Sequence, residues 1–189
     1  MSKTNIKYFI LTGDPGVGKT TLTKKISSLL REKGVPTSGF YTEEVRRNRV
    51  REGFDVVTLD GERGPLAREE SLLSNPAKYK VGKYGVTVQE FEKIALPSLQ
   101  KMEANHLMVI DEIGKMEFFS QPFKSKVKEI FSDTSNNIVL ATIPARKSDN
   151  LIEAIRNHRH AKVFMVTREN RNTIDKIILE EMKKTLNFV

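Results

Sequence analysis

The 189-residue sequence contains no cysteine and no tryptophan, and only three histidines. Without cysteine, the chain cannot form disulfides, bind zinc through thiolates or use a thiol nucleophile. His106, His158 and His160 do not show the spacing of zinc ligands. The longest apolar runs, such as 107–110, have the length of a strand, and the first five residues lack the apolar core of a signal peptide. We therefore expect no membrane partner and a location in the cytoplasm, with the nucleus as the alternative.

The sequence also lacks linkers, low-complexity tracts and internal repeats. Its hydrophobic content of 38% and charged content of 30% are typical of a globular chain. A chain of this length buries roughly 70% of its unfolded surface. We therefore predict a single domain over residues 1–189. The formal charge of +8 would attract a nucleotide or a nucleic acid equally well, so charge does not choose between them.

Short apolar segments alternate with segments of helical periodicity. Apolar strands are expected at 6–12, 107–111, 138–142 and 162–166. The first predicted helix carries Leu22, Ile26, Leu29 and Leu30 and ends at Gly34, and others are expected near 122–131, 150–157 and 174–186. This alternation predicts an α/β fold: a mostly parallel sheet with helices on both faces.

The segment 38–88 has a different pattern and predicts a β-rich hairpin insertion on one edge of that sheet. Strand-like runs at 38–45 and 52–59 flank the arginine-rich segment 46–51, and Asp60-Gly61 is a favoured hairpin turn. A short strand is expected within 81–88. Thr87 and Glu90 then have the spacing of a capping box, followed by a helix that Pro97 should kink; its apolar positions are Phe91, Ile94, Leu99 and Met102.

A phosphate-binding loop follows the first strand. Its eight residues fit G-x-x-x-x-G-K-[ST] at every fixed position, and a helix begins directly after them. The glycines let backbone N–H groups approach phosphate oxygens, and the helix points its positive end at the same anion. Lys19 is expected to act in catalysis at the β- and γ-phosphates, and the Thr20 hydroxyl to bind Mg²⁺. The loop consists of Gly13, Asp14, Pro15, Gly16, Val17, Gly18, Lys19 and Thr20.

Two adjacent acids end the apolar strand 107–111. Asp111 is the candidate second ligand of Mg²⁺, because P-loop proteins hold the metal with an aspartate at this place. Side chains alternate along a strand, so Glu112 should face elsewhere and is the candidate general base. Two solvated acids at a strand end are the alternative interpretation. An acid directly after the metal aspartate also favours an order in which another strand separates the loop strand from the metal strand.

Two further candidates follow the next strand. Thr142 could sense the γ-phosphate or the lytic water, and Arg146 could stabilise charge in the transition state. An ordinary strand-end threonine and a solvated arginine explain them as well. Lys115 could touch phosphate or be a surface lysine.

The sequence specifies neither the base of the nucleotide nor a nucleic-acid partner. No N-K-x-D sequence, which reads guanine in GTPases, occurs in the chain. Arg46, Arg47, Arg49 and Arg51 form the densest basic cluster, which could hold nucleic acid or be a solvated hairpin tip. We favour the solvated tip and expect nucleoside triphosphates to be the partners.

With these motifs in hand, the sequence resembles the small P-loop nucleoside-triphosphatase family that includes animal, archaeal and thermophilic bacterial members. The resemblance covers nearly the whole chain and rests on segments less generic than the phosphate loop, which are 39–46, 53–59, 109–117, 142–144 and 166–172, together with 13–21. It implies hydrolysis of ATP, GTP, CTP and UTP to the diphosphate and phosphate, with broad base tolerance and slow turnover. Asp14 departs from the proline of the animal members.

The resemblance also implies two ATP-contacting stretches. The first is the phosphate loop with Thr21, and the second consists of Leu107, Met108, Val109, Ile110, Asp111, Glu112, Ile113 and Gly114.

Two alternatives stay open. A kinase could place an acceptor against the insertion, with Glu43, Glu44 or Asp55 taking its hydroxyl proton. A nucleotide-dependent switch or RNA-binding module could use slow hydrolysis as a timer. In either case we expect a monomer.

Overall fold

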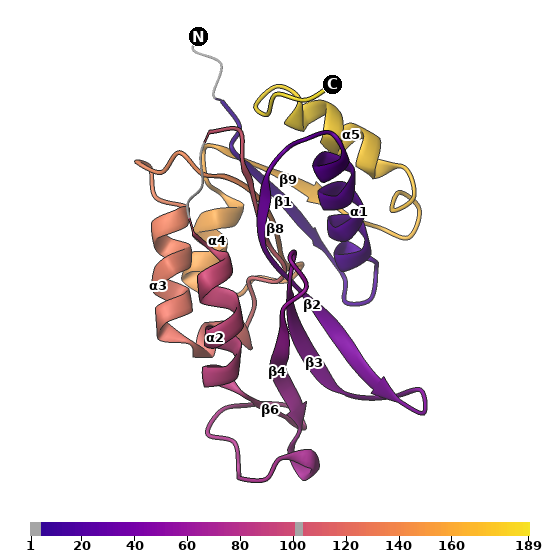
Figure 1. Cartoon of the computed structure of the whole chain (residues 1–189), viewed down its shortest axis with the longest axis vertical. Helices are drawn as coiled ribbons and strands as arrows, with labels where there is room; N and C mark the ends of the chain where they lie inside the picture. The colour runs from indigo at the N-terminus through magenta and orange to yellow at the C-terminus, as the bar shows by residue number, and fades with distance from the viewer. Residues whose placement is uncertain (1–4, 101–103) are drawn as a thin grey trace.

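A computed structural model describes residues 5–100 and 104–189, which form one nine-stranded sheet in the order β5-β6-β4-β3-β2-β7-β8-β1-β9 (Figure 1). Its elements, in chain order, are β1 (Tyr8–Gly13), α1 (Lys19–Glu32), β2 (Thr37–Arg47), β3 (Val50–Thr58), β4 (Arg63–Glu69), η1 (Glu70–Leu72), β5 (Lys80–Val81), β6 (Tyr84–Val86), α2 (Val88–Ser98), β7 (Leu107–Ile110), η2 (Glu117–Phe119), α3 (Gln121–Ile130), β8 (Ile138–Pro144), α4 (Asn150–Arg156), β9 (Ala161–Met165) and α5 (Ile174–Met182).

Helices cover both faces of the parallel core, as the alternation in the sequence predicts. Along β1, Tyr8 and Ile10 pack with residues of α2, α3 and α4, whereas Phe9 and Leu11 pack with residues of α1 and α5. The period of two in the strand therefore separates two apolar clusters, one on each face. Figure 1 shows α1 and α5 on one side of the sheet and α2, α3 and α4 on the other.

The parallel core consists of β2, β7, β8, β1 and β9. Strand β8 lies between β1 and β7, so a strand does separate the loop strand from the metal strand, as predicted. Loops at the carboxyl ends of parallel strands meet at one edge of a sheet, and ligands bind there. The phosphate loop, the acids after β7 and the end of β8 all lie at this edge.

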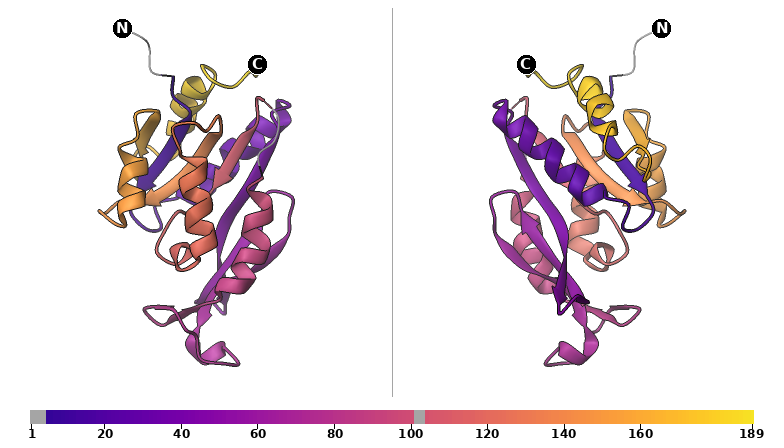
Figure 2. Two further views of the ribbon diagram at one scale, coloured as in Figure 1. Left: turned by 90° about the vertical axis from the view of Figure 1, so that its left-hand side faces the viewer. Right: turned by 90° about the vertical axis from the view of Figure 1, so that its right-hand side faces the viewer.

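The β-rich segment extends the same sheet. The first half of β2 pairs in parallel with β7, and its second half pairs antiparallel with β3. Strands β4, β6 and β5 then continue the antiparallel part (Figure 2). The sequence patterns do not predict β4, because Pro65 and the glycine before it weaken its strand signal. The predicted insertion therefore begins inside a strand of the parallel core.

Three local predictions differ from the structure. The predicted loop at 46–51 is a tight turn, because Asn48 and Arg49 take positive φ values of 50° and 65° and let both strands extend. Thr87 does not cap α2 through its side chain; its hydroxyl donates to the Pro65 carbonyl instead, at 2.9 Å. Helix α2 ends at Ser98, one residue after Pro97, and Met102 lies outside the described residues.

None of the helices within residues 5–100 and 104–189 combines the length and the apolarity needed to cross a bilayer.

Candidate active site

The phosphate loop connects β1 to α1, and two of its glycines are required by its shape. A Cβ on Gly13 would lie 2.5 Å from the Val166 carbonyl oxygen, so the close contact with the segment after β9 leaves no room for a side chain. Gly18 caps α1 with a φ of 112°, which L-residues rarely adopt. The first N–H groups of α1 are therefore directed at the space in front of the loop, where an anion is stabilised.

Lys19 lies across this loop. Its ammonium donates hydrogen bonds to the carbonyl oxygens of Gly13 at 2.6 Å and Asp14 at 3.2 Å, and its side chain is buried. The Asp14 side chain is exposed, so its carboxylate points away from the loop interior. Lys19 is thus the cation that the loop itself carries, and the guanidinium of Arg171, from the segment after β9, donates to the Val17 carbonyl at 3.4 Å.

Asp111 connects the phosphate loop to β8 through two hydrogen bonds. Its Oδ2 accepts a hydrogen bond from the Thr20 hydroxyl at 2.6 Å, and its Oδ1 accepts one from the Thr142 hydroxyl at 2.5 Å. Burial raises the pKa of Asp111, although these hydrogen bonds oppose the effect. Thr142 is itself fully buried, so it orients the aspartate and does not reach the pocket surface.

These oxygens fit Mg²⁺. The ion is hard, prefers oxygen ligands, and is held by one or two carboxylates together with waters and substrate phosphates. The Thr20 hydroxyl and the Asp111 carboxylate supply that partial set beside the anion-binding helix end. No cluster of three or more His, Cys, Asp or Glu that could hold a metal occurs in the described part of the chain.

Glu112 lies beside a second buried acid that the sequence patterns do not single out. A Cβ on Gly114 would lie 3.1 Å from Oε1 of Glu112 and 3.1 Å from Oε2 of Glu117, so the two carboxylates flank this glycine. Burial raises the pKa of Glu112, and the charge of Asp111 adds to the rise. Burial raises the pKa of Glu117 further, followed by the charge of Glu112. The only sequence signal for Glu117 is an acid between Met116 and Phe118, where apolar neighbours imply burial.

We expect Glu117→Gln to stabilise the protein near neutral pH. An acid with a raised pKa in the folded state holds its proton there while the unfolded chain has lost it, so stability falls as pH rises from its ordinary pKa of 4.5 through the raised value. The melting temperature should rise by at least about 2 °C at pH 7.5, the shift for roughly 1 kcal/mol in a chain of this size. At pH 4 the difference should vanish.

Exposed Glu32→Gln on α1 is the control and should leave the melting temperature unchanged at both pH values. A lower melting temperature for Glu117→Gln at pH 7.5 would mean that the native carboxylate is stabilised as an anion.

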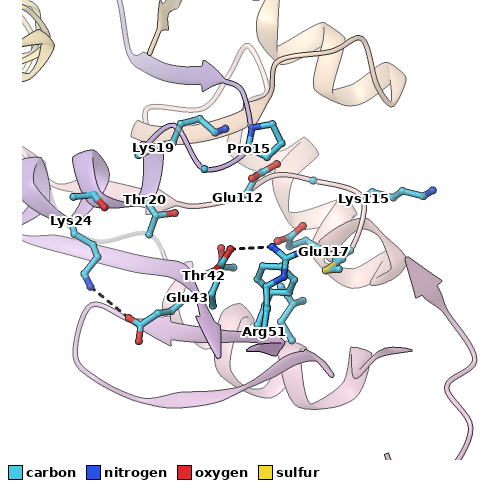
Figure 3. A pocket seen from close by; sticks show the side chains of 18 of the residues that line it. Pro15, Lys19, Thr20, Lys24, Thr42, Glu43, Arg51, Glu112, Lys115 and Glu117 are labelled. Carbon is cyan, nitrogen blue, oxygen red and sulfur yellow. Dashed lines mark hydrogen bonds and ion pairs between the residues drawn. The ribbon is translucent and has the colours of Figure 1, made fainter. Parts of the chain in front are cut away.

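Lys19, Thr20, Glu112 and Glu117 line one cavity of about 860 Å³ between the phosphate loop, the turn after β7 and the strands β2, β3 and β4 (Figure 3). The predicted site residues that it brings together are Pro15, Gly16, Gly18, Lys19, Thr20, Thr21, Glu112 and Gly114. The predicted residues that do not line it include Gly13, Asp14, Val17, Asp111 and Thr142. Asp111 and Thr142 are both buried.

Other predicted site residues lie away from this surface. The strand Leu107–Ile110 and Ile113 are fully buried, because β7 is covered on both faces and only its carboxyl end reaches the cavity. The resemblance implies that the whole stretch 107–114 contacts ATP, but only Glu112 and Gly114 of this stretch line the cavity. Arg146 follows the end of β8 at Pro144 by two residues, is exposed and does not line the cavity.

The cavity also contains residues that the sequence did not assign to the nucleotide site. They come from α1 and the antiparallel extension, and the sequence alone does not reveal the register of β2 and β3 that brings them to the cavity. They are Lys24, Thr42, Arg46, Arg51, Phe54 and Leu66. Two members of the basic cluster, Arg46 and Arg51, thus line the cavity, whereas Arg47 and Arg49 do not. The cluster is not uniformly a solvated tip.

Comparisons with known proteins agree with this geometry. The family described as NTPase matches residues 8–179. The human cancer-related nucleoside-triphosphatase is 50% identical over 175 residues, covering 88% of this chain and 91% of its own. The nucleoside-triphosphatase THEP1 of Thermotoga maritima is 43% identical over 175 residues, covering 92% and 94%. The crystal structure of THEP1 from Aquifex aeolicus superposes with a TM-score of 0.80 at 41% identity, covering 92% of this chain and 97% of that one.

Proposed function

The chain belongs to the NTPase family and is a nucleoside triphosphatase, and from that premise we propose that it is a Mg²⁺-dependent hydrolase of broad base specificity and slow turnover. The observation that carries this proposal is the convergence of Lys19, Thr20 and Glu112 on one cavity, with the buried Asp111 hydrogen-bonded to Thr20. Broad specificity rests on the absence of an N-K-x-D sequence in the chain.

The residues divide the work as follows. The N–H groups at the start of α1 and the ammonium of Lys19 hold the β- and γ-phosphates. Thr20 and Asp111 would hold Mg²⁺, which when bound neutralises charge on the phosphates, and Thr142 keeps the aspartate oriented. Glu112 orients a water for in-line attack on the γ-phosphorus and takes its proton as the bond to the bridging oxygen breaks. The nucleoside diphosphate leaves with the bridging electrons.

We further propose one domain, a monomer and a cytoplasmic location. The continuous nine-stranded sheet supports the single domain, because β2 belongs to both the parallel core and the antiparallel extension. Nucleoside triphosphates are the partners proposed for the cavity.

The test is phosphate release from ATP, GTP, CTP and UTP, with Mg²⁺ and with a chelator, by the wild type and Asp111→Asn. We expect rates within about tenfold of one another for the four nucleotides, because one tenfold corresponds to only about 1.4 kcal/mol. Chelation should abolish release. Asp111→Asn should lower kcat by at least about 10²-fold at any Mg²⁺ concentration, since it removes a charged ligand beside the developing charge. Release that is unchanged by chelation would remove the metal from the proposal.

A further inference from the structure

The cavity extends beyond the phosphate loop. Its volume of about 860 Å³ lies in the upper part of the range for small-molecule sites, roughly 300–1,000 Å³. One wall is the phosphate loop with Lys19 and Thr20. Figure 3 shows Thr42, Glu43 and Arg51 on the opposite side, with Glu112 between the two sets. Lys19 and Thr20, which are assigned above to the phosphates and the metal, lie on the first side, and the second side has no role in that assignment.

The opposite wall carries a fixed group of charges. The Glu44 carboxylate accepts hydrogen bonds from Arg46 at 2.8 Å and from Arg51 at 3.1 Å. Arg51 also donates to the Tyr84 hydroxyl at 2.8 Å and lies over the Phe54 ring, 5.1 Å from its centroid. Two guanidinium groups therefore share one carboxylate, and the group keeps a net positive charge. Such a preorganised guanidinium is suited to a carboxylate or a phosphate.

The same wall also offers apolar surface and a hydroxyl acceptor. Phe54 lines it, and Met116 lines the cavity from the turn after β7, whereas Leu66, at 1% exposure, offers almost no surface. Glu43, which Lys24 and Arg63 hold at 3.5 Å and 2.8 Å, lines it as well. The hydrogen bond from Arg63 lowers the pKa of Glu43, with smaller contributions from Lys24, so Glu43 is a carboxylate that can accept a hydrogen bond from a ligand hydroxyl.

We propose that this half of the cavity is a second ligand site, which holds a small hydroxyl-bearing organic anion with an apolar body as a phosphoryl acceptor. Its anion would pair with Arg51 and Arg46, and its body would pack on Phe54 and Met116. The proposal uses the role of Glu112 given above and adds a transferase activity to hydrolysis.

The transfer replaces water by the acceptor hydroxyl. The hydroxyl oxygen forms a bond to the γ-phosphorus, the bond from that phosphorus to the β,γ-bridging oxygen breaks, and the nucleoside diphosphate leaves with the electron pair. The hydroxyl proton passes to the Glu112 carboxylate. The products are a phosphate ester and a nucleoside diphosphate, and no other reactant is needed.

The experiment follows γ-labelled ATP with Mg²⁺ in the presence of three probes. They are a panel of hydroxy-carboxylates, a panel of hydroxyl-bearing phosphate monoesters, and the low-molecular-mass fraction of a cell extract. We expect the wild type to move label into an organic ester in the extract and in one of the panels, which identifies the anion as carboxylate or phosphate. Label found only in inorganic phosphate with all three probes would overturn the proposal.

Variants localise the transfer. Arg51→Gln should lower the ratio of organic to inorganic label at least tenfold, and Arg51→Lys, which keeps the charge, should lower it less. Arg47→Gln, an exposed arginine on the same hairpin that does not line the cavity, should leave the ratio unchanged. An unchanged ratio in Arg51→Gln would place the acceptor elsewhere. Ester formation without phosphate release from ATP alone would instead contradict the proposed hydrolase function and leave the acceptor site standing.

Discussion

Glu112→Gln is expected to lower kcat by about 10²- to 10⁴-fold, the range of a general base, while nucleotide affinity stays within about threefold. The amide has the shape of the carboxylate but cannot take a proton from the attacking water. Glu112 lies in the turn after β7 rather than on the phosphate loop, so its replacement leaves the groups that hold the phosphates in place. The measurement is steady-state phosphate release together with direct titration of a fluorescent nucleotide.

The pH dependence of kcat/KM provides a second test of the role of Glu112. A general base acts only when ionised, and burial raises the pKa of Glu112 above its ordinary 4.5. The wild-type kcat/KM should therefore fall as pH decreases through that raised value, and this acid limb should be absent from the residual activity of Glu112→Gln. Glu32→Gln, an exposed acid on α1, should behave as the wild type. A variant that turns over within tenfold of the wild type would remove Glu112 as the base.

Lys19→Ala is expected to weaken nucleotide binding at least tenfold and to lower kcat/KM by about 10³-fold, the effect of removing one preorganised charge from a developing anion. Its ammonium is the cation fixed on the phosphate loop, where it is held by two loop carbonyls. Binding and turnover should fall together, unlike the effect of Glu112→Gln. Titration calorimetry and phosphate release measure the two effects.

The control for Lys19→Ala is Lys176→Ala, an exposed lysine of α5. The far-ultraviolet circular dichroism and melting temperature of both variants show whether the loop still folds, since Lys19 also bonds Gly13. Undiminished affinity of a folded Lys19→Ala would mean that backbone N–H groups alone hold the phosphates.

The sequence by itself determined the parts of the site that are contiguous in the chain. The phosphate loop is eight successive residues whose glycines, lysine and threonine each have a role that depends on local structure. Its pattern can therefore be recognised without knowing the fold. Apolar runs of strand length and helices of period 3.6 determined the α/β class, because burial on two faces imposes those periods locally. Asp111 and Glu112 were predictable for the same reason, as acids at the end of a buried strand.

Only the tertiary structure decided which distant residues share the cavity. Lys24 and Arg51 come from α1 and β3, and they meet across a space whose position depends on the register of β2 against β7 and β3. Charged residues on such strands look like a solvated face in the sequence, because their pattern is the same whether that face meets water or a ligand. Arg146 is another such case, because its place in the sequence after Thr142 does not decide whether it lines the cavity, and in the structure it does not. The chemistry of a side chain follows from its residue type, whereas the cavity is formed by several secondary-structure elements that the fold brings together.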